Sequence, residues 1–166
     1  MLYIHTDPVG AGIGWDLTQL VKACGLPMDS VAFPNPLEYR YGMPKEHLAA
    51  LYTGMDVMLA ASYGEGFGVP TIEAQACGTR VIASSWAASA DLVSEDSWLV
   101  DGQPLWDASQ LSWWRSPSVP SIVEALELAY KEGRGRSEKA IEFAKQFDVE
   151  NVWTNNWQPY FKKVFG

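Results

Sequence analysis

Residues 62–76, SYGEGFGVPTIEAQA, contain the residue types in this chain that are best suited to binding a phosphate group. Gly64, Gly66 and Gly68 alternate ahead of a predicted helix, and glycine lets the backbone approach a ligand closely. Pro70 suits the first turn of that helix because its missing N–H would have no helical partner. Free N–H groups and the positive end of the helix dipole favour an anion at this point. The segment therefore predicts an anion cradle.

Two carboxylates flank this cradle. Glu65 lies among the glycines and Glu73 in the predicted first turn of the helix, with seven residues between them. The helix dipole alone favours a carboxylate in a first turn, so a purely structural role for Glu73 is one interpretation. Ligand binding is the other, because an ionised carboxylate only accepts hydrogen bonds and the two ribose hydroxyls can donate to it. A cradle beside a diol acceptor would form a nucleotide site.

The elements that would position these residues alternate between strand and helix. Residues 37–43 are predicted to be a loop. Alternation at this spacing is typical of an α/β fold in which a Rossmann-like parallel sheet carries helices on both faces. Ligands bind at the carboxyl edge of such sheets, where the glycines would lie. The predicted strands are residues 2–6, 31–33, 56–61, 80–84 and 98–100, and the predicted helices between them are 16–24, 44–54 and 70–78.

The last third of the chain has a different character. Residues 102–120 are rich in Trp, Ser and Pro and contain no predicted strand, and helical patterns follow at 121–132, 136–147 and 149–164. We predict one domain over residues 1–166, with a core over 1–120, a Trp-rich insertion at 102–120 and C-terminal helices over 121–166. The Trp residues of the insertion are interpreted as a hydrophobic cover over the sheet or as a contact surface.

Composition excludes several classes of protein. The 166 residues carry 12 Lys plus Arg against 20 Asp plus Glu, a net charge of -8, so nucleic acid is not an expected partner. Apolar runs are far shorter than the ~20 residues of a transmembrane helix. Cys24 and Cys77 are too few for a disulfide framework or zinc site, and His5 and His47 show no metal-ligand spacing. We expect a cytoplasmic protein with no metal.

Residues 65–84, EGFGVPTIEAQACGTRVIAS, resemble the E-x7-E signature of retaining glycosyltransferases of the GT-B fold, in the large family four. The flanking residues 48–68, LAALYTGMDVMLAASYGEGFG, and 81–100, VIASSWAASADLVSEDSWLV, resemble the same family. The resemblance covers residues 2–100 well and 121–165 loosely. It implies the C-terminal, Rossmann-like half of a GT-B enzyme, which binds the donor nucleotide sugar.

The resemblance also implies roles for individual residues. Glu73 would accept hydrogen bonds from the ribose, and Glu65 would be the catalytic-site carboxylate that binds the sugar hydroxyls. The base would lie near Pro34 and Asn35. The donor would be a UDP or GDP sugar transferred with retention of configuration, without a metal or other cofactor. The backbone expected to contact the diphosphate and the sugar is that of Gly66, Phe67, Gly68 and Val69.

The family's acceptor-binding domain and its Arg/Lys pair have no counterpart in these residues. We therefore expect an N-terminal acceptor domain or a partner chain to complete the enzyme, and expect the chain alone to bind a nucleotide sugar weakly or not at all, without transferase activity. A non-catalytic nucleotide- or carbohydrate-binding module, or a subunit-interface module, is the alternative, since Trp stacks on sugars and anchors interfaces. The glycines within residues 10–14 do not complete a dinucleotide fingerprint, because Trp15 stands where that motif needs glycine.

Overall fold

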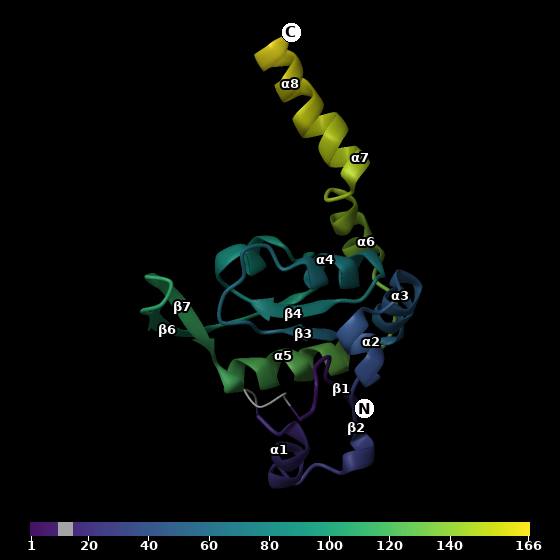
Figure 1. Cartoon of the computed structure of the whole chain (residues 1–166), viewed down its shortest axis with the longest axis vertical. Coiled ribbons are helices and arrows are strands. Elements are labelled where there is room, and N and C mark those ends of the chain that lie inside the picture. The colour runs from purple at the N-terminus through teal and green to yellow at the C-terminus, as the bar shows by residue number, and fades with distance from the viewer. Residues whose placement is uncertain (10–14) are drawn as a thin grey trace. The chain divides into compact units, whose positions relative to one another are not determined.

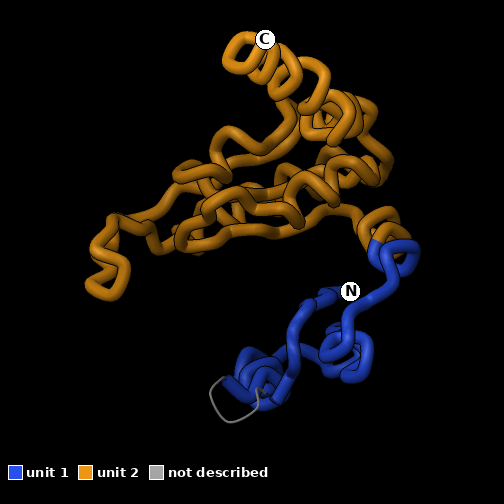
Figure 2. The backbone as a smooth tube through the Cα atoms, turned by 45° about the horizontal axis from the view of Figure 1, so that its top comes forward, with its two compact units in different colours: residues 1–48 blue, residues 49–166 orange. Residues whose placement is uncertain are grey.

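The computed structural model describes residues 1–9 and 15–166. The chain forms two compact units, residues 1–48 and residues 49–166 (Figure 2). A mixed α/β architecture with parallel strands flanked by helices is present, which confirms the predicted fold class.

Unit 1 contains a short parallel pair, β1 (Leu2–Tyr3) and β2 (Val31–Ala32). Both strands are shorter than predicted. Asp16 caps the first helix by accepting hydrogen bonds from the backbone N–H groups of Thr18 and Gln19, as an N-cap aspartate should. The helical elements of this unit are α1 (Leu17–Ala23), the 3₁₀ turn η1 (Met28–Ser30) and α2 (Pro36–Tyr41), and α3 (Lys45–Gly54) contains the boundary between the units.

Helix α2 corrects the prediction of a loop over residues 37–43. The Asn35 side chain accepts a 2.9 Å hydrogen bond from the N–H of Leu37, and Pro36 is the first helical residue. Asparagine at the N-cap followed by proline is a strong helix start. The prediction treated these residues only as the end of a strand and so missed the start of a helix.

Unit 2 is built on a parallel sheet of three strands in the order β3-β4-β5. Helix α4 contacts β3 and β4, whereas α5 contacts β4 and β5, and the two helices cover opposite faces of the sheet (Figure 1). This is the arrangement expected of βαβ units. The strands are β3 (Met58–Ala60), β4 (Val81–Ser84) and β5 (Trp98–Val100), and the helical elements are α4 (Val69–Ala76), the 3₁₀ turn η2 (Ala87–Asp91) and α5 (Val119–Glu132).

The core of unit 2 is centred on β4, whose four residues are all buried. Ile82 packs with Val100 of β5 and Ala125 of α5, so one side of the strand is covered by α5. A strand that is apolar on both sides is typical of a parallel sheet between two helical layers. The buried β4 is accordingly the central strand of the sheet, between β3 and β5.

Residues 102–117 form an antiparallel hairpin, which the prediction did not contain. Strand β6 (Gly102–Asp107) pairs with β7 (Ser112–Pro117), with Trp106 opposite Trp113. The Asp107 carboxylate accepts hydrogen bonds from the backbone N–H groups of Ser109 and Gln110 and so stabilises the turn. In Figure 1 the hairpin extends beyond the sheet. It is therefore not the predicted cover over the sheet.

The C-terminal helical patterns are confirmed. The predicted helix over 149–164 is one continuous helical segment with a central turn of π-helix. Among residues 1–9 and 15–166, no helix combines the length and apolar character needed to cross a membrane. The elements are α6 (Glu138–Lys145), α7 (Val149–Val152), the π-helix η3 (Trp153–Trp157) and α8 (Gln158–Phe165).

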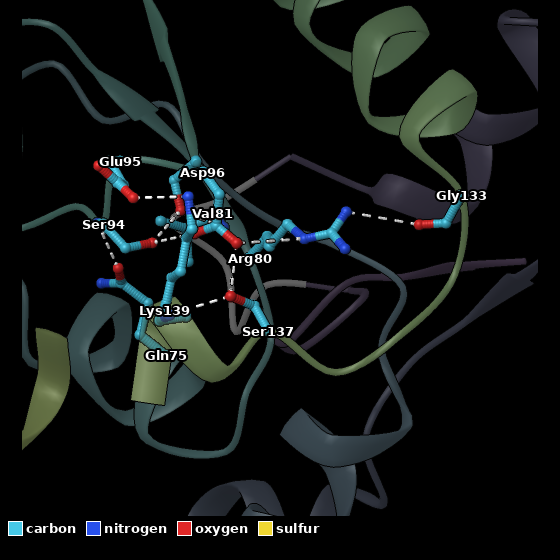
Figure 3. Close-up of polar contacts among 11 residues, drawn as sticks. Gln75, Arg80, Val81, Ser94, Glu95, Asp96, Gly133, Ser137 and Lys139 are labelled. Atoms are coloured by element: carbon cyan, nitrogen blue, oxygen red, sulfur yellow. Dashed lines mark hydrogen bonds and ion pairs between the residues drawn. The ribbon is translucent and has the colours of Figure 1, made fainter. Parts of the chain in front are cut away.

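A network of polar side chains joins α4 to the loop before β5 (Figure 3). The fully buried amide of Gln75 donates to the carbonyl oxygens of Thr71 and Leu92, at 3.0 and 2.8 Å, and accepts from the N–H of Ser94 at 2.7 Å. Both amide N–H groups are therefore used, and the amide oxygen also accepts one hydrogen bond. The network holds α4 in a fixed position on the sheet.

Asp96 extends this network to α6. Burial alone would raise the pKa of Asp96, but hydrogen bonds from Ser137 and Ser94 lower it on balance. Arg80 adds an ion pair, with Nε 3.6 Å from the carboxylate (Figure 3). Ser137 is also the N-cap of α6, so the same carboxylate helps to fix where that helix begins.

We predict that Gln75→Ala lowers the free energy of unfolding by about 2–4 kcal/mol, because it leaves a cavity and unpaired buried backbone groups. Urea denaturation measures this loss. The exposed Gln103 in β6 supplies the control, where the same substitution should change stability by less than about 0.5 kcal/mol. Equal losses at the two positions would contradict a supporting role for the Gln75 network.

Candidate functional site

Residues 61–68, called the glycine segment below, connect the carboxyl end of β3 to the first residue of α4. Because β3, β4 and β5 are parallel, the residues that follow them meet at one edge of the sheet. Trp86 follows β4 and Asp101 follows β5 at that same edge. The structure thus places the segment where α/β folds bind ligands, as the sequence predicts.

Gly68 is the N-cap of α4 and has the left-handed backbone conformation, with φ 85° and ψ 53°. Glycine adopts this conformation without steric cost. The carbonyl oxygen of Gly68 accepts the first helical hydrogen bond from Thr71, and no side chain caps the helix. Pro70 has no N–H and that of Thr71 is already used, so Val69 offers the N–H of this first turn that remains available for an anion.

The neighbouring residues of the segment lie at the surface. Glu65, Gly66 and Val69 are exposed, and a Cβ on Gly66 would meet no atom within 4 Å. The Phe67 ring packs edge-on against Phe147, with 5.7 Å between ring centroids. An aromatic anchor of this kind fixes the middle of the segment while its backbone stays accessible.

Glu73 is the fifth residue of α4 and so lies in its second turn, which corrects the prediction of the first turn. The helix dipole therefore does not explain Glu73, because stabilisation of a negative charge by the dipole is confined to the first turn. Glu73 Oε2 instead accepts a 3.1 Å hydrogen bond from the hydroxyl of Tyr52 in α3. A carboxylate offers about four acceptor positions, so one bond leaves capacity for a diol.

Tyr52 is a site residue that the sequence analysis did not single out. It is 7% exposed, and burial together with the Glu73 carboxylate raises its pKa above the usual range. The hydroxyl therefore stays protonated and donates to Glu73. Its own backbone carbonyl accepts a 2.6 Å hydrogen bond from Thr79. The sequence carries only a weak signal for this role, because Tyr52 falls on the apolar face of a predicted helix.

The residues predicted to contact the base lie in unit 1. Pro34 is buried, so little of its surface is accessible to a base. Asn35 is exposed, but its side-chain oxygen is used in capping α2. Glu65, Glu73 and the backbone between them share unit 2, whereas Pro34 and Asn35 belong to the other unit. The glycines of residues 10–14 lie outside the described residues.

A separate concavity of about 690 Å³ lies beside α6, and it contains no predicted donor-binding residue. Within the described part of the chain, no group of three or more His, Cys, Asp or Glu side chains is arranged to hold a metal ion. The concavity is lined by Glu142, Lys145, Gln146, Phe147, Asn151, Val152, Asn155, Asn156 and Trp157.

The family described as "Glycosyl transferases group 1" matches residues 9–110, well over half of the chain. The chain belongs to the group 1 glycosyltransferases. Membership confirms the family resemblance drawn from residues 48–100, and family members of this type have the GT-B architecture.

Relatives with curated names include D-inositol 3-phosphate glycosyltransferases. The protein from Mycobacteroides abscessus is 34% identical over 106 residues, which are 62% of this chain and 21% of that protein. The protein from Mycolicibacterium smegmatis is 33% identical over 150 residues, 87% of this chain and 30% of its own length. The chain thus spans less than a third of the length of these curated relatives.

Two solved structures share the fold. Sucrose-phosphate synthase from Thermosynechococcus elongatus matches with a TM-score of 0.67 and 24% identity, over 97% of this chain and 37% of that chain. The C-terminal domain of a glycosyl transferase group 1 family protein from Francisella tularensis matches with a TM-score of 0.50 and 23% identity, over 86% and 60% respectively. The GT-B type of fold is therefore confirmed for this chain.

We predict that Gly68→Ala lowers the free energy of unfolding by about 1–2 kcal/mol, because a side chain is strained in the left-handed conformation. Gly66→Ala is the matched control, since Gly66 lies outside that conformation and has open space around it. The control should change stability by less than about 0.5 kcal/mol in urea denaturation. A Gly66→Ala loss as large as that of Gly68→Ala would argue against the conformational role.

Proposed function

We propose that this chain supplies the donor-binding part of a retaining glycosyltransferase that uses a UDP or GDP sugar. The observation that carries the proposal is the pairing of an uncapped helix N-terminus at Gly68 with the carboxylate of Glu73 on the same helix. The first favours the diphosphate and the second favours the ribose diol. A chain of group 1 glycosyltransferase sequence with both features is suited to a nucleoside diphosphate sugar.

The diphosphate would lie against the backbone of the glycine segment. The N–H groups of Gly66, Phe67, Gly68 and Val69 would donate to it, and the positive end of α4 would stabilise charge on the departing nucleoside diphosphate. Backbone donors and a helix dipole can supply this stabilisation without a metal ion. The proposal therefore assigns no metal or other cofactor to the site.

The two carboxylates would divide the remaining contacts. Glu73, held by the Tyr52 hydroxyl, would accept from both ribose hydroxyls, and the 3.1 Å bond would keep the carboxylate in one orientation. Glu65 is exposed in the glycine segment and would accept hydrogen bonds from the sugar. Pro34 and Asn35 of unit 1 are proposed as the main-chain contacts of the base.

Catalysis would need more than this chain. The relatives are over three times as long as the part that this chain matches, so we propose that an acceptor-binding domain or partner chain completes the active site. The chain itself would bind the donor weakly, because contacts from that second part are missing.

A non-catalytic binding or interface module is the second candidate. Trp106 and Trp113 favour it, because both are exposed and their rings pack edge-on with centroids 5.3 Å apart. Such a module would bind a free sugar or a protein through this hairpin and would not distinguish nucleotides. Nucleotide binding that depends on Glu73 separates the two candidates.

We predict that Glu73→Ala reduces affinity for UDP or GDP at least tenfold, because the ribose loses its acceptor. Tyr52→Phe should reduce this affinity about two- to tenfold, because it removes the one hydrogen bond that orients Glu73. Titration monitored by Trp fluorescence measures both effects.

Glu124→Ala on the exposed side of α5 is the control for a lost negative charge and should bind like the wild type. Circular dichroism checks that each variant is folded. Wild-type affinity in Glu73→Ala would disprove the ribose assignment, and a wild-type chain that binds neither nucleotide at millimolar concentration would disprove the proposed function.

We predict that Glu65→Gln weakens binding of the nucleotide sugar about two- to tenfold and leaves binding of the free nucleotide within twofold. The physical reason is that the neutral amide is a weaker acceptor for sugar hydroxyls. Calorimetric titration with UDP, GDP and their sugars gives both affinities. If nucleotide and nucleotide-sugar affinity fell together, Glu65 would not be a sugar contact.

A further inference from the structure

The carbonyl oxygen of Tyr63 lies where the glycine segment begins, and it accepts two hydrogen bonds. The indole Nε1 of Trp86 donates one at 2.8 Å, and the backbone N–H of Arg115 in β7 donates the other at 3.1 Å. Two donors from two different elements fix the orientation of the peptide group between Tyr63 and Gly64. The direction in which the segment leaves the sheet is thus set by residues outside it.

The N–H of Arg115 is free for this bond because of its position in the hairpin. Arg115 lies opposite Pro104, which has no N–H to donate, so these two residues cannot exchange a pair of ladder hydrogen bonds. When two opposite residues do not exchange ladder hydrogen bonds, their N–H groups point away from the partner strand. The N–H of Arg115 therefore points away from β6 and donates to the carbonyl oxygen of Tyr63.

Side chains reinforce the same junction. The Trp114 ring lies 3.9 Å from the place that a Cβ on Gly64 would occupy. The Arg115 guanidinium lies 5.7 Å from the centroid of the Trp86 ring, which is within cation–π range. Its Nη1 is also 3.3 Å from the Asp101 carboxylate. Arg115 thus helps to hold the indole of Trp86 with its N–H on Tyr63, and the Trp114 ring packs beside Gly64.

We propose that hairpin β6–β7, through Trp114, Arg115 and the Trp86 indole that Arg115 covers, positions the glycine segment and determines how tightly the sugar of the donor is bound. This inference rests on the proposed donor-binding function. Tyr63 and Gly64 directly precede Glu65, the proposed sugar contact, whereas Glu73 is oriented by Tyr52 from α3. The hairpin therefore acts on the start of the segment beside Glu65, whereas Phe67 and Gly68, which would contact the diphosphate, are held by Phe147 and by the start of α4. Trp86, Trp114 and Arg115 are positioning residues.

Trp86→Phe and Trp114→Ala test the inference. The first keeps an aromatic ring and removes the indole N–H, and the second removes the ring beside Gly64. Trp113→Ala is the matched control, because Trp113 is the neighbouring residue of β7, is 70% exposed and packs on Trp106. Trp114→Phe should restore the wild-type behaviour, since it returns an aromatic ring to the same place.

Hydrogen–deuterium exchange of the unliganded chain reads out the positioning itself. Amides of residues 63–65 should exchange about two- to tenfold faster in Trp86→Phe and Trp114→Ala, the factor for one lost hydrogen bond. Exchange in Trp113→Ala and Trp114→Phe should match the wild type. Wild-type exchange in both test variants would overturn the inference.

Calorimetric titration with UDP-glucose, GDP-mannose, UDP and GDP reads out the consequence. For the nucleotide that the wild type binds, both test variants should bind the nucleotide sugar about two- to tenfold more weakly and the nucleotide within twofold. A merely structural role would weaken both ligands together, and that result would overturn the inference. Failure of the wild type to bind any probe would disprove the proposed function. If the wild type binds a probe and both test variants bind it with the same affinity, only the hairpin's role is disproved.

Discussion

Burial of β4 between two helical layers is the constraint on which the architecture of unit 2 depends. All four of its residues are buried, with α5 packed on Ile82 and α4 in contact with the strand. A strand covered on both faces is typical of the centre of a parallel sheet with crossover helices, and both neighbours of β4 are parallel to it. The carboxyl ends of β3, β4 and β5 then meet at one edge, and the glycine segment, Trp86 and Asp101 meet there.

Several parts of the proposed ligand site at this edge are held by other residues. Glu73 is held by Tyr52, the start of the glycine segment is held by Trp86 and Arg115, and its middle is anchored by Phe67 on Phe147. Gly68 supplies the left-handed residue from which α4 begins. A loop rich in glycine is costly to order, and contacts of this kind supply the order before a ligand arrives.

Local sequence patterns predicted much of this structure. The alternation of apolar runs with helical patterns predicted β3, β4, β5 and their helices, and the glycines predicted the start of α4. The hairpin was not predicted, because Trp and Pro at residues 102–117 concealed the alternation of a strand pair. Helix α2 was missed because Asn35 and Pro36 serve equally well to end a strand and to begin a helix.

Within the site, the sequence could indicate residue types but not their partners. Tyr52 is 21 residues from Glu73, and Arg115 is over 50 residues from Tyr63, so only the folded chain brings each pair together. The second-turn position of Glu73 was also missed, because α4 begins at Val69, one residue before the predicted first helical residue Pro70. Long-range contacts of this kind determine the geometry of the site, and a local sequence motif does not predict them.

The most direct test of the central claim is a ¹⁵N NMR titration of the chain with UDP, GDP and their sugars. The account predicts saturable shifts at the amides of residues 64–69, with smaller shifts around Glu73 and little change along α6 and α8. Saturable shifts confined to the hairpin or to the concavity beside α6, or no shifts at millimolar ligand, would contradict it.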